Sequence, residues 1–288
     1  MIDASDVALI FEGGGMRASY TAPVAARFLQ EDVRFGWVGG ISAGASHTAN
    51  FLSGDLWRTR HSFTDFAADE QFGGWSSMAR GRGYFNAAYI YEGSGEAMPY
   101  DFDTFAANPA DMHIEALRAD TGETVAWSRA DIHGAGDLMV RVRASSTIPV
   151  AMVAPLIDGV EYVDGAMGTS GGLLIDAAEK AGYSRFAVIC SRPRSYRKAE
   201  VSRPRAARAL LRSRPAVAEA MIARPAKYNA SKDRILELER EGRAKVFFPD
   251  SMPVSTGERS VQRLASSYRA GERQMAKEWG RWREFLGG

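Results

Sequence analysis

Two glycine-rich segments near the N-terminus decide the fold of this chain: residues 7–15 are VALIFEGGG, and residues 37–44 are WVGGISAG. Each begins with a short apolar run and ends in small residues, which is typical of a buried strand entering a tight turn. Helical patterns follow over residues 18–30 and 45–52. Strands that alternate with helices predict a mostly parallel sheet with helices on both faces. We therefore expect a three-layer α/β/α fold.

The rest of the chain continues this alternation. Residues 55–105 are rich in aromatic residues and glycine, and predict short helices and loops over one end of the sheet. Beyond them we expect hairpins of residues 112–118 with 124–127 and of 153–157 with 160–163, strands at 186–190 and 245–248, and helices at 137–145 and 258–285. No repeat or linker interrupts the sequence, so we predict one domain over residues 1–288. Its motif-bearing core spans about residues 7–170, with C-terminal strands and helices over 171–288.

Composition limits the class of protein. The chain has 45% apolar residues, 25% charged residues and a net charge of +1, as in an ordinary globular protein without an overall affinity for nucleic acid. The single cysteine, Cys190, allows no intramolecular disulfide and suits a reducing compartment. The sequence shows no secretory signal pattern and no apolar run near the roughly 18 residues of a membrane span. We expect a cytoplasmic protein whose membrane contact, if it has any, is peripheral.

Two segments allow two interpretations each. Residues 185–224 contain eleven Lys or Arg and two Glu. They form either a solvated helical face or a surface for anionic lipid head groups, which attract each nearby basic residue by about 1 kcal/mol. No aromatic interleaving supports a nucleic-acid role. The aromatic residues between positions 57 and 91 belong either to an acyl-chain pocket or lid, or to ordinary packing.

The turn at Gly40-Ile41-Ser42-Ala43-Gly44 has the pattern G-x-S-x-G between a strand and a helix. This pattern places a serine on a sharp, strained turn, where Gly40 and Gly44 let the backbone bend and a substrate approach. The hydroxyl then projects above the sheet, near the N-terminus of the following helix. We predict Ser42 as a nucleophile; the alternative is a tight turn with an incidental serine.

The loop Gly13-Gly14-Gly15 opens the first helix and also has two interpretations. The pattern G-x-G-x-x-A over residues 13–18 resembles a dinucleotide-binding fingerprint. That fingerprint requires an acidic residue on the second strand, about 20 residues further on. Glu31 and Asp32 precede that strand, and the second turn carries Ser42 instead. An oxyanion loop, whose glycine amides converge on a developing negative charge, fits better.

The base that would activate Ser42 is not a histidine placed as in an α/β-hydrolase, because no histidine follows residue 133. We expect the four histidines to be structural or solvent-facing: His47 on the helix after the turn, His113 in a hairpin, and His61 and His133 in loops. An aspartate in an apolar setting can take the proton directly. Asp164 ends an apolar strand; Asp158 has the same Asp-Gly dipeptide within a hairpin turn, and composition does not separate the two.

Four segments, in this order and spacing, resemble the motifs of the patatin-like phospholipases: residues 12–17 (EGGGMR), 40–45 (GISAGA), 144–149 (ASSTIP) and 162–166 (YVDGA). The tail around residues 268–271 is similar to bacterial members. Two small-residue exchanges depart from the family pattern, with Ala18 and Ala166 at positions that are often glycine.

The resemblance implies a Ser–Asp dyad, with Ser42 as nucleophile and Asp164 as general base. It also implies an oxyanion hole and supporting residues: Gly13, Gly14, Gly15 and Met16 for the oxyanion hole, and Arg17, Gly40, Gly44 and Gly165 in support. The implied activity is calcium-independent hydrolysis of lipid acyl esters, of the phospholipase A type, without a metal or cofactor. An acyltransferase with the same dyad, or a non-catalytic lipid-binding protein, are the alternatives.

Overall fold

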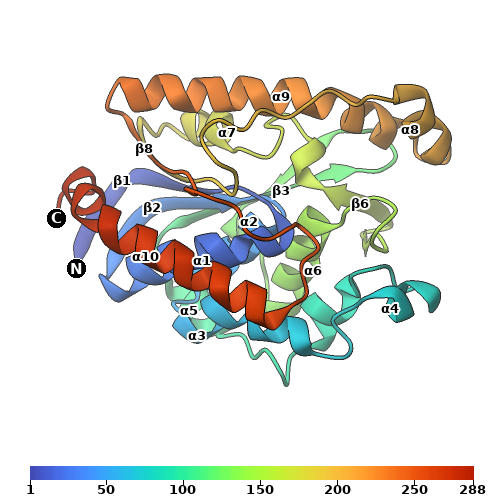
Figure 1. The fold of residues 1–288 in the computed structure, drawn as a ribbon, viewed down its shortest axis with the longest axis horizontal. Helices are drawn as coiled ribbons and strands as arrows, with labels where there is room; N and C mark the ends of the chain where they lie inside the picture. Colours follow the sequence, from blue (N-terminus) through green and yellow to red (C-terminus); the bar gives the residue numbers. More distant parts are fainter.

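A mostly parallel sheet of eight strands forms the centre of the computed structural model, which describes residues 1–288 (Figure 1). The strand order is β5-β6-β3-β2-β1-β7-β8, and β4 pairs with β3. Strands β3, β2, β1, β7 and β8 are parallel, whereas β4 and β6 run antiparallel to β3, and β5 to β6. The bounds are β1 Ile2–Phe11, β2 Val33–Gly40, β3 Asp111–Arg118, β4 Thr124–Trp127, β5 Leu156–Ile157, β6 Val160–Asp164, β7 Arg185–Ile189 and β8 Ala244–Phe247.

Helices cover both faces of this sheet. Figure 1 shows α7 and α9 on one face, and α1, α2, α6 and α10 on the other. The bounds are α1 Ala18–Gln30, α2 Ala43–Leu52, α3 Leu56–His61, α4 Trp75–Ala79, α5 Phe102–Ala107, α6 Ala135–Ser146, α7 Ile175–Lys180, α8 Pro204–Leu210, α9 Pro215–Arg240 and α10 Val261–Phe285. None of these helices combines the length and the apolar character that crossing a bilayer requires. The three-layer α/β/α architecture is as the sequence predicted.

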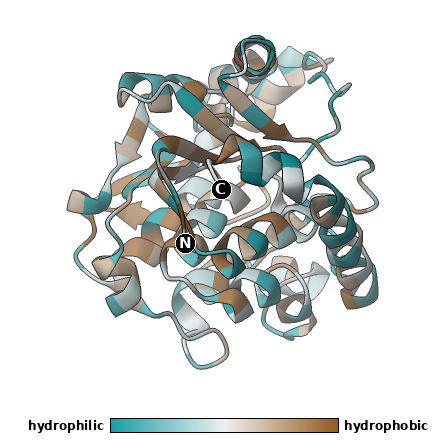
Figure 2. Ribbon diagram, turned by 90° about the vertical axis from the view of Figure 1, so that its left-hand side faces the viewer, coloured by the Kyte–Doolittle hydropathy of each residue, from teal (hydrophilic) through white to brown (hydrophobic).

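Strand β1 supplies core residues to both layers, because successive side chains of a strand point to opposite faces. Leu9 and Phe11 pack with α1, α2 and α10, while Ala8 and Ile10 pack with α7 and α9. All four are fully or almost fully buried. In Figure 2 the hydrophobic colour accordingly concentrates on the central strands. A strand covered on both faces needs the continuous apolar run that the sequence contains.

Most expected elements are present, but their ends differ. Strand β1 starts five residues and β2 four residues earlier than the apolar runs suggested, because their first residues alternate between buried apolar and exposed polar side chains and so lie outside a continuous apolar run. The strand expected at 153–157 shortens to Leu156–Ile157, directly after Pro155, which has no N–H to donate to a ladder. Helix α9, 26 residues long, was not predicted, because Pro215 and Pro225 interrupt its sequence. Pro215 stands in the first turn, where its missing N–H costs nothing.

Helix α10 crosses α1 at a glycine. A Cβ on Gly271 would lie 2.0 Å from the carbonyl oxygen of Tyr20, so the two backbones are in contact there. Two hydrogen bonds flank the crossing: one joins the hydroxyls of Ser19 and Ser267 (2.9 Å), and Tyr20 Oη donates to Gln274 Oε1 (2.8 Å). The crossing brings the C-terminal helix to the layer that supports the first glycine-rich loop.

Gly271→Ala should therefore lower the free energy of unfolding by about 1–3 kcal/mol, because the added methyl group must push α10 away from α1. Gly280→Ala, in the same helix, is the matched control: its Cβ meets nothing within 4 Å, and alanine raises helix propensity by up to about 1 kcal/mol. Thermal unfolding followed by circular dichroism compares the two. Equal melting temperatures for both variants would contradict the close crossing.

Candidate active site

Ser42 occupies a strained turn between β2 and α2. Its backbone angles are φ +60° and ψ −127°, in the left-handed half of φ space that a side chain rarely adopts. The turn is held by a hydrogen bond in which the Ser42 N–H donates to Ser145 Oγ at 3.0 Å. Ser145 lies near the end of α6, in the segment 144–149 singled out in the sequence. Strain of this kind is typical of a nucleophile elbow.

The glycines on either side of Ser42 permit backbone packing that no other residue allows. A Cβ on Gly40 would lie 2.1 Å from the carbonyl oxygen of Gly44, and a Cβ on Gly44 would lie 2.1 Å from that of Phe11. The start of α2 therefore rests directly on the end of β1. This contact places Ser42 beside the loop that follows β1.

That loop, Gly13–Gly15, lies against Ser42 and has amides without partners. A Cβ on Gly13 would lie 2.9 Å from Cβ of Ser42, so the loop and the serine are immediate neighbours. The N–H groups of Gly13, Gly14 and Gly15 donate no hydrogen bond within the protein. The N–H of Met16, by contrast, donates to the carbonyl oxygen of Thr256 at 3.0 Å. Met16, expected as an oxyanion donor, thus brings its side chain and not its amide to the site.

Arg17 connects this loop to the segments around residues 191 and 256. Its Nε donates to the carbonyl oxygen of Ser191 at 3.3 Å, and its Nη1 donates to Thr256 Oγ1. The hydroxyl of Ser191, which follows β7, in turn donates to the carbonyl oxygen of Gly13 at 2.6 Å. The resemblance to the patatin-like phospholipases implied an anchoring role for Arg17. Its partners went unrecognised, because residues so distant in the chain leave no local signal.

Glu12 completes the support. Its carboxylate accepts hydrogen bonds from the backbone N–H of Ser191 at 2.6 Å and from the hydroxyl of Tyr228, on α9, at 3.1 Å. Both carboxylate oxygens of this buried side chain therefore have partners. The first glycine-rich loop is thus held by β7, α9 and the segment around residue 256.

Asp164 ends strand β6, which lies on the other side of β3 from the strand that precedes Ser42. In the register of the sheet, Gly40 pairs with Ile114 of β3, and Asp164 pairs with Ala116 of the same strand. Strands β2 and β6 therefore flank β3, and their ends bring Ser42 and Asp164 to one edge. Both side chains line one cavity. A Cβ on Gly165 would lie 2.1 Å from the carbonyl oxygen of Glu115, so the glycine after Asp164 is required for close packing on β3.

The surroundings of Asp164 make it a stronger base than an exposed aspartate. Burial raises the pKa of its carboxyl group, and this effect outweighs four opposing ones: Arg224, the Ala166 amide, the Ser42 side chain and Lys198. The Ala166 N–H donates to Oδ1 at 2.8 Å. Asp158, the other Asp-Gly candidate, is exposed in the β5–β6 turn with φ +53° and lines neither cavity described here.

No histidine borders Ser42. His47 is buried in α2, where its Nε2 lies 3.0 Å from Thr21 Oγ1 and burial lowers its pKa to about 3, so the ring is neutral. His113 lies on β3 with its Nε2 2.9 Å from Glu115 Oε1. His61 ends α3, not a loop as expected, and faces Asp65. His133 is exposed in a loop. None of the four lines either cavity at Ser42.

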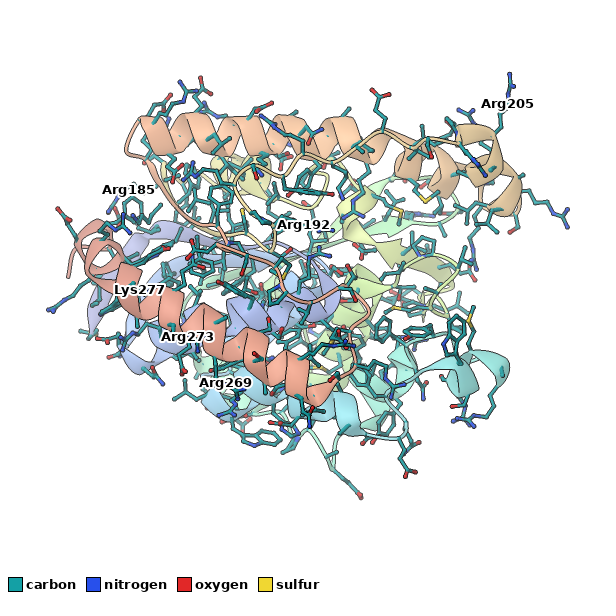
Figure 3. The ribbon with its side chains drawn as sticks, in the orientation of Figure 1. Arg185, Arg192, Arg205, Arg269, Arg273 and Lys277 are labelled. Atoms are coloured by element: carbon teal, nitrogen blue, oxygen red, sulfur yellow. The ribbon has the colours of Figure 1, made fainter.

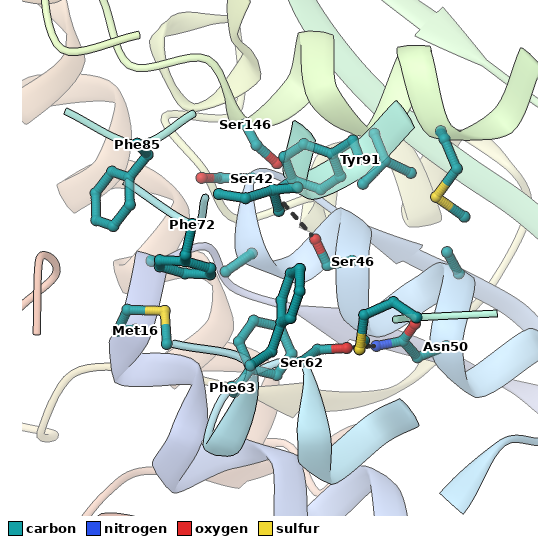
Figure 4. Close-up of a pocket in the computed structure, with 18 of the residues that line it drawn as sticks. Met16, Ser42, Ser46, Asn50, Ser62, Phe63, Phe72, Phe85, Tyr91 and Ser146 are labelled. Carbon is teal, nitrogen blue, oxygen red and sulfur yellow. Dashed lines mark hydrogen bonds between the residues drawn. The ribbon is translucent and has the colours of Figure 1, made fainter. Parts of the chain in front are cut away.

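Two cavities of different chemistry meet at Ser42. One is lined mainly by apolar side chains, and Figure 4 shows Ser42 and Ser146 on one side of it with Ser62 and Phe63 across. The other contains the Gly13–Gly15 loop and Asp164 together with basic side chains. Ser42 lines both cavities, so a molecule bound at its hydroxyl can extend into the apolar cavity on one side and into the polar cavity on the other.

The apolar cavity follows helix α2 away from Ser42. Ser42, Ser46 and Asn50 recur every fourth residue along one face of the helix, so the lining extends about 12 Å. Phe66, Phe72 and Phe85 also line this cavity and are buried. The sequence left open whether the aromatic residues at 57–91 form an acyl-chain pocket or ordinary packing. In the structure these phenylalanines do both, because they are buried in the core and also line the cavity.

Comparison with known proteins identifies the family of this chain. Residues 9–175 match the family model for Patatin-like phospholipase, which covers more than half of the chain. The chain therefore belongs to the patatin-like phospholipase family. Residues 214–287, with α9 and α10, match a Domain of unknown function (DUF6363).

Among solved structures, the chain is similar to VipD from Legionella pneumophila, with 12% sequence identity and a TM-score of 0.47. The alignment covers 98% of this chain and 66% of the VipD chain, so this chain spans just under two thirds of that protein's length. A search of curated proteins gave no match.

The raised pKa of Asp164 leads to a prediction about stability. Between the pKa of an unfolded aspartate and the higher pKa in the folded protein, the folded state binds more protons, so ionising Asp164 costs stability as the pH rises. Asp164→Asn removes that cost while its amide oxygen still accepts the Ala166 N–H. The variant should therefore melt at a higher temperature than the wild type at pH 7. The difference should shrink toward pH 4; a constant or reversed difference would contradict it.

Proposed function

We propose that this protein is a serine hydrolase that cleaves acyl esters of lipids through Ser42 and Asp164. The observation that carries the proposal is the position of Ser42: on a strained elbow, beside three free glycine amides, where an apolar and a polar cavity meet. Membership of the patatin-like phospholipase family supports the same reaction.

The reaction proceeds in two steps. Ser42 Oγ attacks the ester carbonyl carbon while Asp164 accepts the hydroxyl proton, and the amides of Gly13–Gly15 donate to the oxyanion of the tetrahedral intermediate. The C–O bond then breaks, and the alcohol leaves with the proton returned by Asp164. In the second step Asp164 takes a proton from water, the resulting hydroxide attacks the acyl-serine, and the fatty acid is released as Ser42 regains its proton.

The two cavities divide the substrate between them. The acyl chain lies in the apolar cavity along α2, because burying its methylene groups there removes apolar surface from water. The alcohol part of the ester then points into the polar cavity. The acyl ester of a lipid, with an apolar tail and a polar alcohol, fits this arrangement.

Peripheral contact with a membrane is a further part of the proposal. Trp75 and Met78 of α4 are 77% and 43% exposed, and the strand-like bridges Gly73–Phe85 and Gly83–Met152 connect their segment to walls of the apolar cavity. Exposed apolar side chains beside the entrance of a lipid site are typical of membrane interaction sites. We place the lipid-facing rim at Trp75, Met78, Val150 and Val153.

The dyad is tested by substitution. Ser42→Ala and Asp164→Asn should each lower kcat for p-nitrophenyl butyrate by about 1,000-fold or more, with unchanged circular dichroism. Asp158→Asn, the matched control with the same Asp-Gly dipeptide, should keep full activity. The pH profile of kcat/KM should rise through a pKa above that of an ordinary aspartate, because Asp164 must be ionised to accept the proton.

A fluorophosphonate should label Ser42 in the wild type and fail to label Ser42→Ala. Full activity in either the Ser42→Ala or the Asp164→Asn variant would contradict the mechanism. A wild-type protein that the fluorophosphonate does not label would favour a non-catalytic lipid-binding role.

The place of the acyl chain is tested by filling the cavity. Ser46 lies one turn along α2 from Ser42, and its Oγ is 3.4 Å from Tyr91 Oη (Figure 4). Ser46→Phe should lower kcat/KM for p-nitrophenyl laurate by about tenfold while sparing p-nitrophenyl butyrate, because only the long chain passes residue 46. Ser46→Ala, which adds no volume, is the control. Equal losses for both esters would contradict the assignment.

A further inference from the structure

The basic residues between positions 185 and 224 fall into three groups. Five form ion pairs with carboxylates: Arg185, Arg194, Arg197, Arg208 and Arg214. Three lie on or beside α8 without an ion pair: Arg203, Arg205 and Arg212. The remaining three line the polar cavity beside Ser42: Arg192, Lys198 and Arg224. In Figure 3 Arg192 lies inward between α9 and the sheet, whereas Arg205 projects from the molecule.

These three cavity cations lack a carboxylate partner. No Asp or Glu oxygen lies within 4.0 Å of Arg192, Lys198 or Arg224, although ion pairs are frequent elsewhere in the same segment. The only carboxylates in the cavity lining are Glu12 and Asp164. Glu12 is already held by the Ser191 amide and the Tyr228 hydroxyl. With Arg17, four cations face two carboxylates, so the cavity carries an excess of positive charge.

The three side chains are held in place by aromatic rings and backbone. The guanidinium of Arg192 lies 4.5 Å from the ring centre of Tyr196, and the Lys198 ammonium 5.0 Å from that of Tyr228. Asn229 of α9 clamps the Lys198 backbone with two hydrogen bonds, each of 3.0 Å. Arg224 extends from α9, and its Nε lies 3.5 Å from the carbonyl oxygen of Gly171. Fixed donors of this kind bind an anion without first being ordered.

Burial and the neighbouring cations together affect the Lys198 ammonium group. Burial is the main cause that lowers the pKa of its ammonium group to about 8, and Arg224 lowers it further. Glu12 opposes these effects, and Arg192 and Arg17 make smaller contributions in the same direction as Arg224. A group with two or three anionic oxygens would relieve this repulsion. Arginine offers such a group a planar pair of N–H donors, and lysine a compact charge.

We propose that Arg192, Lys198 and Arg224 form a subsite for a phosphate group on the alcohol side of the scissile ester. This inference rests on the proposed hydrolase function. With the acyl chain along α2 and the carbonyl carbon at Ser42, the alcohol extends into the polar cavity, where its phosphate meets the three cations. The preferred substrate is therefore an acyl ester whose alcohol carries a phosphate, which leaves still attached to the alcohol when the acyl C–O bond breaks.

The test compares two esters that differ only in the phosphate: 1-oleoylglycerol and 1-oleoylglycerol 3-phosphate, both in micelles of a neutral detergent. The wild type should prefer the phosphate ester by at least about tenfold in kcat/KM. Lys198→Met and Arg224→Met should each reduce that preference by about tenfold. The ratio is the readout, because losing either cation also changes the pKa of Asp164, which affects both esters alike.

Arg197→Met is the matched control. Arg197 adjoins Lys198 in sequence but pairs with Asp233 on the surface, so its loss should leave the ratio unchanged. No preference in the wild type, or equal losses for both esters in the Lys198 and Arg224 variants, would overturn the subsite assignment.

A second measurement separates this inference from the hydrolase proposal. Inorganic phosphate, against chloride at equal ionic strength, should raise the melting temperature of the wild type and of Ser42→Ala. The rise should be absent in a variant with both Lys198→Met and Arg224→Met. If the wild type cleaves neither ester, the hydrolase proposal fails, and this shift alone decides whether the anion site exists. A shift that depends on both residues, without preference for the phosphate ester, would overturn the assignment to the substrate.

Discussion

The contact between the start of α2 and the end of β1 is the constraint on which the rest of the site depends. Gly44 rests on the carbonyl of Phe11, and Gly13 rests against Cβ of Ser42, at separations that exclude any added carbon atom. Two parallel strands can bring their carboxyl ends together, but only residues without a Cβ let the turns that follow them touch. The strain at Ser42 follows from this packing, because the chain must reverse within one residue to enter α2. The hydroxyl and the free amides of the Gly13–Gly15 loop are thereby fixed relative to each other before any ligand arrives, which is the condition for stabilising charge without reorganisation.

Much of this arrangement could be predicted from sequence because its signals are local. An apolar run that ends in glycine predicts a strand and a turn, and helix α1 begins and ends where its pattern indicates. The absence of a late histidine favoured an aspartate as base, and the structure separates Asp164 from Asp158 by burial, which composition could not do. The residues that hold the first loop were missed for the opposite reason. Ser191, Thr256 and Tyr228 meet Glu12 and Arg17 only through tertiary packing, and nothing in their neighbouring sequence marks them.

The basic segment shows how a single compositional feature can divide into unrelated roles. In the sequence, residues 185–224 show only an excess of positive charge, which a solvated face and a lipid-binding face would share. In the structure, five of these side chains pair with carboxylates, which are exposed or partly exposed and contribute at most about 1 kcal/mol each. Arg192, Lys198 and Arg224 differ because the fold brings them together in one partly buried cavity, where none of them forms an ion pair and cations outnumber carboxylates. Charge that is left unpaired inside a cavity has an energetic cost, and natural proteins accept such a cost mainly at functional sites.

The dependence of the first loop on Ser191, Tyr228 and Thr256 has a consequence for synthesis. The chain emerges from the ribosome with its N-terminus first, and by residue 175, where the patatin-like match ends, Ser42 and Asp164 have both been made. The groups that hold Glu12, Gly13 and Arg17 in place are all translated later, the last of them at position 256. A nascent chain therefore carries Ser42 without the contacts that hold the neighbouring loop in place. The proposed active site is therefore assembled only after the C-terminal third has been made, so the folding of that third governs when the site is complete.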